Sequence, residues 1–288
     1  VDEESCVHCG KCLKISDRGC LAAKSLWITL GGARVNSNRK SINPYNHFGM
    51  RKEWLEDYFR DPSTWPERHT LGPRQADSMT VWLNHCGIEA SKSLSPLGAI
   101  LQRLGAESEV AWCAIWANLA QNSGIVEWYV RSVPWGSVHN KADFVEMLGE
   151  SWSVSTRNNA ITALTGLLAN TPLGNQLELG VISSDRSTRT KSVFKKGLSS
   201  PHAIAVLYSL YLYAEASDVY RTTIAQLETA CGGPATIFGL DRPALASILN
   251  GLSAECSDFI SAGITRNLDN IHLRRDRTSI EVLTLALD

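Results

Sequence analysis

Three segments of this sequence combine short turns with amphipathic helical patterns. They are "TLGPRQADSMTVWLNHCGI" (70–88), "KADFVEMLGESWSVSTRNNAITALTGLLAN" (141–170) and "YRTTIAQLETACGGPATIFGLDRPALASILNGLSAE" (220–255). Alternation of apolar and polar residues, which is typical of strands, is scarce outside "NQLELGVIS" (175–183). Helix pairs joined by a turn are common in all-α proteins, and they are also the pattern of DNA-binding helix-turn-helix and winged-helix modules. The sequence therefore predicts a mainly α fold with several such modules and small β-hairpins.

A central block, "VAWCAIWANLAQ" (110–121), places Trp112, Ile115, Trp116 and Leu119 on one face of a helix. This spacing predicts a buried helix. A chain of 288 residues is longer than one compact core normally holds. We therefore predict four parts: a cysteine-rich segment (1–42), a helical domain with the first helix-turn-helix (43–138), a winged-helix-like module (139–200) and a C-terminal helical module (201–288).

Four cysteines stand close together in "SCVHCGKCLKISDRGC" (5–20), namely Cys6, Cys9, Cys12 and Cys20. Three thiolates at three-residue intervals can surround one metal centre, and bacterial ferredoxins hold an iron–sulfur cluster in such a loop. The last gap is longer than in ferredoxins, and Leu21 stands where they have proline. We predict a ferredoxin-like [4Fe–4S] site with these four ligands, and a zinc site is the alternative. The cysteines at 86, 113, 231 and 256 are predicted to lie in the apolar core.

Basic residues gather in two segments, although the formal net charge is only −1. "SSDRSTRTKSVFKKG" (183–197) follows the second helix of the 141–170 unit, and "HLRRDRTS" (272–279) follows the 220–255 unit. Ser155 or Thr156 is predicted to cap that second helix. Such a helix can enter a groove of DNA while basic loops hold phosphates, and solvated loops are the alternative. The predicted DNA-binding residues are Arg157, Asn158, Asn159, Arg186, Arg189, Lys191, Lys195, Lys196, Arg274, Arg275 and Arg277.

Catalytic motifs are hard to place in this sequence. The GxxxxGK[ST] and GxGxxG nucleotide loops and the G-x-S-x-G nucleophile elbow are absent. Glu53, Glu56 and Asp57 share one helical face near Asp61, and we interpret them as a solvated face and not as a metal site. Whether the chain is an enzyme, such as a DNA nickase, stays open. No apolar stretch reaches the length of about 20 residues that a membrane span needs, and no export signal is recognised, so a cytoplasmic protein is predicted.

Several segments resemble one family in the same order along the chain. They are "NPYNHFGMRKEWLEDYF" (43–59), "LGPRQADSMTVWLNHCGI" (71–88), "LSPLGAIL" (94–101), "AWCAIWANLA" (111–120) and "SVSTRNNAITALTGLL" (153–168). Together they resemble a domain-of-unknown-function family of bacterial DNA phosphorothioation clusters, the B component of the single-strand (Ssp) system. A similar domain is also fused to enzymes that resemble phosphoadenosine-phosphosulfate (PAPS) reductase. No catalytic residue is carried over to this chain, because the resembling segments mostly determine the fold.

The resemblance implies a DNA-binding protein that acts in antiphage defence. It implies binding, and nicking, of DNA so that sulfur replaces a non-bridging phosphate oxygen. The implied partners are DNA, a PAPS-reductase-like sulfurtransferase and other phosphorothioation proteins. Two further hypotheses stay open: a redox-sensing iron–sulfur winged-helix transcription regulator, and a ferredoxin-like electron donor. A regulator should bind one operator tightly, whereas a modification component should bind many sequences with a steep dependence on salt.

Overall fold

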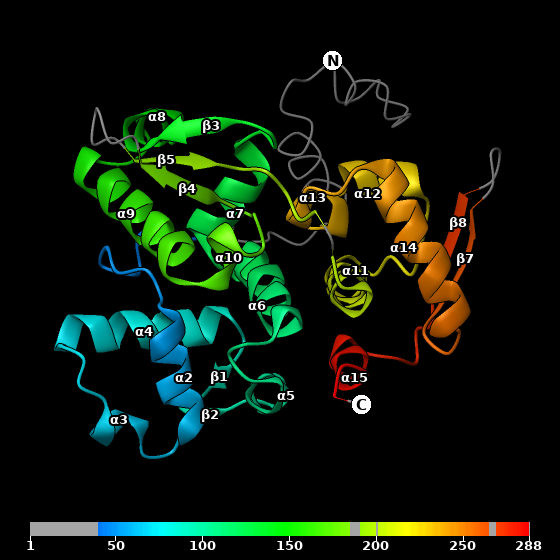
Figure 1. Cartoon of the computed structure of the whole chain (residues 1–288), viewed down its shortest axis with the longest axis horizontal. Coiled ribbons are helices and arrows are strands. Elements are labelled where there is room, and N and C mark those ends of the chain that lie inside the picture. Colours follow the sequence, from blue (N-terminus) through cyan, green and yellow to red (C-terminus); the bar gives the residue numbers. More distant parts are fainter. Residues whose placement is uncertain (1–39, 185–190, 200, 265–268, 288) are drawn as a thin grey trace, which may run out of the picture.

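The computed structural model describes residues 40–184, 191–199, 201–264 and 269–287. Figure 1 shows a mainly helical molecule with three small antiparallel sheets, which confirms the predicted fold class in its broad form. The predicted cysteine ligands lie outside the described residues. In the described part of the chain, no helix has both the length and the apolar character that crossing a membrane requires.

The first unit contains four helices and a short hairpin, and it is fastened by the segment 42–50. The ring of Tyr45 stacks on Trp82 with 3.5 Å between the centroids. The carbonyl oxygen of Phe48 accepts hydrogen bonds from Ser78 Oγ and Trp82 Nε1, at 3.0 and 2.9 Å. The elements are α2 (Lys52–Arg60), α3 (Trp65–Arg68), α4 (Pro73–His85), β1 (Glu89–Ala90), β2 (Ser93–Leu94) and α5 (Pro96–Leu104).

Two consecutive helices follow, α6 (Glu109–Asn122) and α7 (Gly124–Ser132). The side chains of Ser108 and Ser123 cap their first turns by accepting from backbone amides. Every residue of α6 from 110 to 120 is buried. The sequence predicted one buried face, but α6 is covered on all sides because separate units pack around it.

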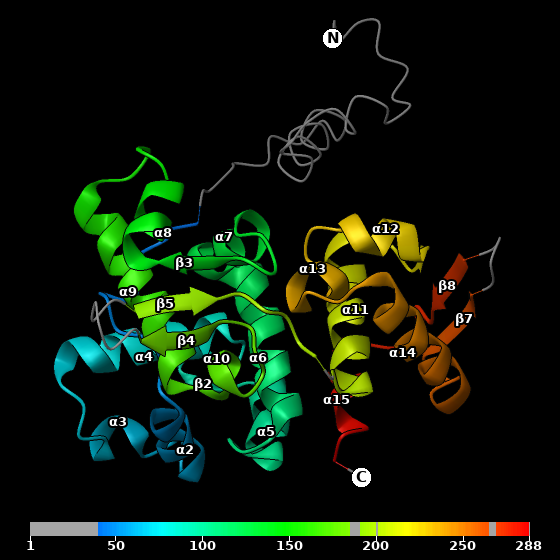
Figure 2. The same cartoon turned by 45° about the horizontal axis from the view of Figure 1, so that its top comes forward.

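A second unit contains α7, three further helices and a three-stranded sheet (Figure 2). The strands pair antiparallel in the order β3-β5-β4, so that the last strand lies in the middle. The predicted helix pair and hairpin are both present. The elements after α7 are β3 (Val138–Asn140), α8 (Lys141–Met147), α9 (Val154–Asn170), α10 (Pro172–Asn175), β4 (Val181–Ser184) and β5 (Lys191–Phe194).

The cap of α9 differs from the prediction. Ser153, and not Ser155 or Thr156, is the N-cap, and its hydroxyl accepts from the amide of Thr156 at 3.1 Å. The helix therefore starts at Val154. Arg157, Asn158 and Asn159 consequently lie two or three residues further into the helix than predicted.

The third unit repeats the element order of the second. Its sheet has the order β6-β8-β7, again with the last strand in the middle. Both units run helix, strand, helix, helix, strand, strand, apart from the short α10 and α13, although no long sequence repeat is visible. The elements are α11 (Ala203–Ser217), β6 (Arg221–Thr222), α12 (Ile224–Thr229), α13 (Pro234–Phe238), α14 (Arg242–Glu255), β7 (Ile260–Ile264), β8 (Asp269–Leu273) and α15 (Ser279–Thr284).

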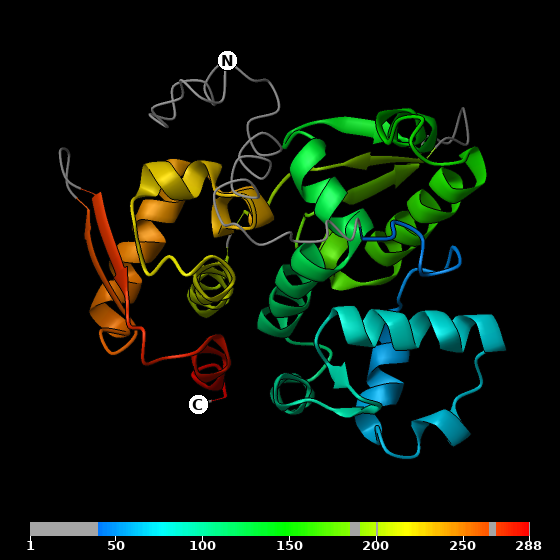
Figure 3. The same ribbon diagram turned by 180° about the vertical axis from the view of Figure 1, so that it is seen from behind.

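Helix α6 joins the third unit to the rest, as the view from behind shows (Figure 3). Trp116 Nε1 donates to the carbonyl oxygen of Ile237 at 2.9 Å. Asn118 Nδ2 donates to the hydroxyl of Tyr208 on α11 at 2.7 Å. Both bonds are buried, so each satisfies a polar group that water cannot reach.

Lys195 continues β5 into the core and is fully buried. Its ammonium donates to the carbonyl oxygens of Tyr129, Val130 and Val133 at 2.8, 3.0 and 2.6 Å. It also lies 4.8 Å from the ring centroid of Tyr129 and 4.0 Å from that of Trp135. A cation at the last turn of a helix interacts favourably with its carbonyls. Lys195 therefore fastens the end of α7 to the sheet.

Replacing this lysine should destabilise the protein. We expect Lys195→Met to lower the free energy of unfolding by about 2 kcal/mol, because three buried carbonyl oxygens lose a donor. Lys196→Met is the matched control. Lys196 is exposed and pairs with Glu178 at the surface, so its loss should change the free energy by less than about 1 kcal/mol. Urea unfolding of both variants measures the difference, and equal effects would contradict this role.

The same pair of variants tests how the free energy of unfolding depends on pH. Burial lowers the pKa of Lys195 to about 7, whereas an unfolded lysine titrates near about 10.4. Between these values the unfolded chain binds the extra proton, so the free energy of unfolding should rise with pH above 7. Lys195→Met should lack this rise and Lys196→Met should keep it. A parallel pH profile for all three proteins would contradict the expectation.

Candidate nucleic-acid interface

The first half of α9 forms one open surface with α8. Val154 is 60% exposed and Ser155 is exposed. A shallow groove of about 580 Å³ separates the two helices. It is lined by Lys141, Ala142, Val145, Glu146, Val154, Arg157 and Asn158. This groove brings together two of the predicted DNA-binding residues.

The side chains of Arg157 and Asn158 differ in how firmly they are held. The guanidinium of Arg157 donates to the carbonyl oxygen of Val145 at 3.0 Å, so it also ties α9 to α8. Asn158 Nδ2 donates to the carbonyl oxygen of Val154 one turn earlier, at 2.9 Å. An amide that bonds only to its own helix can exchange that bond for another partner. Asn159 is half-buried on the same helix.

The second half of α9 is covered by the segment 42–50. A Cβ atom on Gly49 would lie 2.1 Å from the amide nitrogen of Leu167 and 2.6 Å from the carbonyl oxygen of Ala163. Only glycine permits this approach between the two backbones. The part of α9 that a ligand can reach is therefore its first two turns.

The basic segment 183–197 does not form one surface. Lys191 is exposed on β5, and Lys196 is exposed but paired with Glu178. Lys195 is buried and holds the end of α7, so the prediction that it meets phosphate is wrong: it has no exposed surface. Arg186 and Arg189 lie outside the described residues.

A larger groove, of about 910 Å³, lies on the outer face of the β6-β8-β7 sheet. We call it the sheet groove. Strand register aligns Arg221, His272 and Ser261 in one row across three strands. Their neighbours Thr222, Ile271 and Ala262 form the next row, which faces the core side. The lining residues are Asp218, Val219, Tyr220, Arg221, Ser261, His272, Leu273, Arg274 and Arg275.

The predicted arginines of segment 272–279 divide between this groove and a partly exposed position beside Phe259. Arg274 and Arg275 line the groove. Arg275 lies 4.7 Å from the ring centroid of Tyr220 and pairs with Asp218 at 3.0 Å. Arg277 instead lies 5.3 Å from the ring centroid of Phe259 and pairs with Glu281 at 3.6 Å. It does not line the groove.

Tyr220, Arg221 and His272 are among the groove residues that the sequence analysis missed. His272 could have been found, because it stands between the apolar Ile271 and Leu273 in "DNIHL", and such alternation is typical of a strand with one outward face. Arg221 carries no such local signal. Its position beside His272 depends on pairing between strands about 50 residues apart in the sequence.

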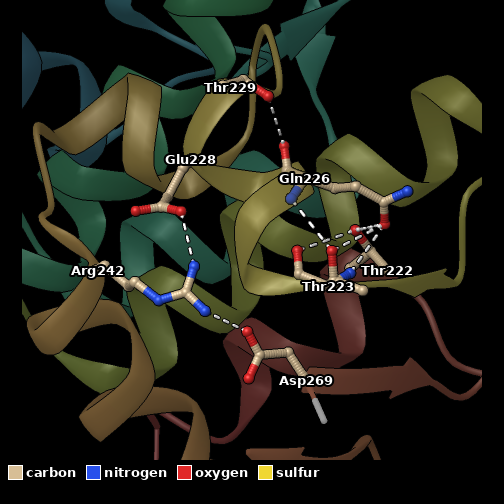
Figure 4. A network of polar contacts seen from close by, with 7 residues as sticks. All are labelled: Thr222, Thr223, Gln226, Glu228, Thr229, Arg242 and Asp269. Carbon is tan, nitrogen blue, oxygen red and sulfur yellow. Dashed lines mark hydrogen bonds and ion pairs between the residues drawn. The ribbon is translucent and has the colours of Figure 1, made fainter. Parts of the chain in front are cut away.

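The first turn of α14 has the opposite electrostatic character (Figure 4). Arg242 pairs with Glu228 on α12 at 2.9 Å and also with Asp269 on β8. Asp241 caps the helix by accepting from the amide of Ala244 at 2.9 Å. Two carboxylates therefore pair with one guanidinium, and a third carboxylate caps the same helix, where the equivalent helix of the second unit is open.

The acidic residues of the first unit are engaged locally. Arg60 and Arg68 both pair with Asp57, and Lys52 pairs with Glu56 at 3.4 Å. Hydrogen bonds from Ser63 and Thr64 lower the pKa of Asp61 to about 2. Among the described residues, no three His, Cys, Asp or Glu side chains are grouped so that they could hold a metal ion.

The two classes of arginine predict different effects on stability. Arg277→Ala should lower the free energy of unfolding by about 1 kcal/mol, because a guanidinium over an aromatic ring and its packed stem are lost. Arg274→Ala should change it by less than about 0.5 kcal/mol, as for an exposed residue outside the core. Thermal unfolding compares the two. A larger loss for Arg274→Ala would show that the groove arginine is structural.

Comparison with known proteins shows which solved structures have a similar fold. No protein-family model and no curated protein matches the chain. The structure titled "Magnesium ion-bound SspB crystal structure" is similar at a TM-score of 0.63 and 15% identity, over 85% of this chain and 86% of that one. The structure titled "SspB crystal structure" gives a TM-score of 0.62 and 14% identity over the same shares. The predicted resemblance to the B component of the Ssp system is thus confirmed at the level of the fold.

Proposed function

We propose that this protein is a DNA-binding component of a DNA phosphorothioation system of the Ssp type. The observation that carries the proposal is the fold that it shares with SspB over 85% of the chain. Fold alone does not specify function. The proposal therefore also needs surfaces that suit DNA, and the second and third units supply them.

We assign the second unit as a winged-helix module. Its order of elements, with the last strand in the middle of the sheet, fits such a module. The helix after the turn, α9, would enter the major groove with its exposed first two turns. The β4–β5 hairpin, with Lys191 on it, would contact the phosphate backbone. Val154 offers an apolar contact and Asn158 an amide that suits adenine.

Sulfur chemistry belongs to partners in this proposal. The sequence has no phosphate-binding loop with which to activate ATP or sulfur. A PAPS-reductase-like sulfurtransferase, with other phosphorothioation proteins, would supply the sulfur while this chain holds the DNA in the cytoplasm. The SspB structure with the higher TM-score is titled as bound to magnesium. The described residues of this chain do not fit such a site, and we derive no cleavage step from it.

DNA binding can be tested by gel shift at several salt concentrations. Arg189→Ala with Lys191→Ala should weaken binding to all sequences and lower the salt slope by about one unit for each lost phosphate contact. Asn158→Ala should instead change which sequences are preferred. Lys92→Ala, an exposed lysine of the β1–β2 hairpin region, is the control for charge.

The same gel shifts separate the hypotheses. Binding to many sequences with a steep salt dependence supports a modification component. Tight binding to one operator, altered by oxidation, would favour the redox-sensing regulator. If the Arg189/Lys191 variant and Asn158→Ala both bind as the parent does, the second unit is not the DNA-binding surface.

We also propose that Cys6, Cys9, Cys12 and Cys20 hold a [4Fe–4S] cluster. The support is their spacing alone. Protein purified without oxygen should be brown and contain iron and acid-labile sulfide in near-equal amounts, and Cys9→Ala should lose both. Cys113→Ala is the control, because that thiol is buried in α6. A colourless protein with one bound zinc would replace the cluster with a structural zinc site.

A further inference from the structure

The two units with the same element order distribute their charges differently. We infer that the third unit binds a single nucleic-acid strand in the sheet groove, and that it does not use α14 as a DNA-reading helix. This inference rests on the proposed DNA-binding function and assigns a separate site and ligand form to the third unit. Three observations carry it.

The first observation is the unpaired positive charge in the sheet groove. Within the described residues, no ion pair or side-chain hydrogen bond engages Arg221 or Arg274. Arg275 is paired, but it and Asp218 are 65% and 78% exposed, so this ion pair is weak and can be exchanged. Arg221 and Arg274 are thus two unpaired cations along one groove, and such cations attract a polyanion.

The second observation is the neutralised first turn of α14. A reading helix presents its first turn to bases that are flanked by phosphates. Here Glu228 and Asp269 both pair with Arg242 (Figure 4). Asp241, the N-cap of the same helix, adds a third carboxylate. The net charge of this cluster is negative, so it repels a phosphate backbone.

The third observation is the position and shape of the groove. The sheet lies at the edge of the molecule, with α14 on its inner side, in Figures 1 and 3. A concavity on a sheet admits one extended strand, whereas a duplex presents a broad convex surface. Tyr220 and the guanidinium of Arg275 stack within the groove. Aromatic rings and arginine planes beside a cationic track are the groups on which unpaired bases stack.

The test measures fluorescence anisotropy with the full-length protein. The probes are a labelled single strand of about 12 nucleotides and the corresponding duplex, each at low and at moderate salt. Arg221→Glu with Arg274→Glu should weaken single-strand binding at least about tenfold and reduce its salt slope. Tyr220→Ala should weaken it about fivefold or more through lost stacking. Duplex affinity should change less than about twofold in both variants.

The matched control reverses two exposed cations of the first unit, Arg74→Glu with Lys92→Glu, and so changes the net charge equally. Thermal unfolding confirms that each variant is folded. Unchanged single-strand affinity in the Arg221/Arg274 variant, or an equal loss in the control, would overturn the inference. A loss confined to the duplex would overturn the choice of ligand.

Failure of the single-strand inference can be distinguished from failure of the proposed DNA-binding function. Asn158→Ala and the Arg189/Lys191 variant act on the second unit and should leave single-strand binding intact. If the parent binds duplex but no single strand, only the inference fails. If the parent binds neither probe, the proposed DNA-binding function itself fails. Competition by inorganic phosphate at concentrations that leave duplex binding intact would show that the groove takes a free anion and not a strand.

Discussion

The burial of α6 on every side is the constraint on which the rest of the structure depends. A helix with no polar face cannot be stable until neighbours cover all of it. Its two indoles show how the neighbours do so: Trp112 Nε1 donates to Ala106 in the preceding loop, and Trp116 Nε1 donates to Ile237 in the third unit. Each buried donor needs its acceptor in place. The units therefore share one hydrophobic core and are not independently packed domains.

Within that core, the two similar units show that a shared order of elements does not specify a shared surface. The second unit leaves the first turns of α9 open, with Val154 and Ser155 exposed. The third unit fills the equivalent place with the Glu228–Arg242–Asp269 ion pairs and carries its free cations on the opposite side, on the sheet. Function depends on which side chains a fold carries at a given surface, and not on the fold itself. Two units with the same order of elements therefore differ in which of their faces carries exposed charge.

The helices could be predicted because their signals are local. Apolar spacing and caps identified α4, α8, α9 and α14, with an error of two or three residues at the cap of α9. The cysteines show the limit of this reasoning: Cys86 and Cys113 are buried as predicted, whereas those at 231 and 256 are only partly buried. Arg221 could not be assigned to the site, because its place beside His272 depends on strand pairing that local spacing does not encode.

Adjacent lysines explain why counting charges along a sequence assigned a buried residue, Lys195, to a surface. Successive residues of a strand point to opposite faces, so a basic run on a strand divides between core and solvent. Lys195 turns inward, where carbonyl oxygens and aromatic rings replace water, and Lys196 turns outward. A lysine can be buried only where such partners are ready, and the end of α7 supplies them. The cation that was expected to bind phosphate instead positions α7 beneath the sheet that carries the hairpin.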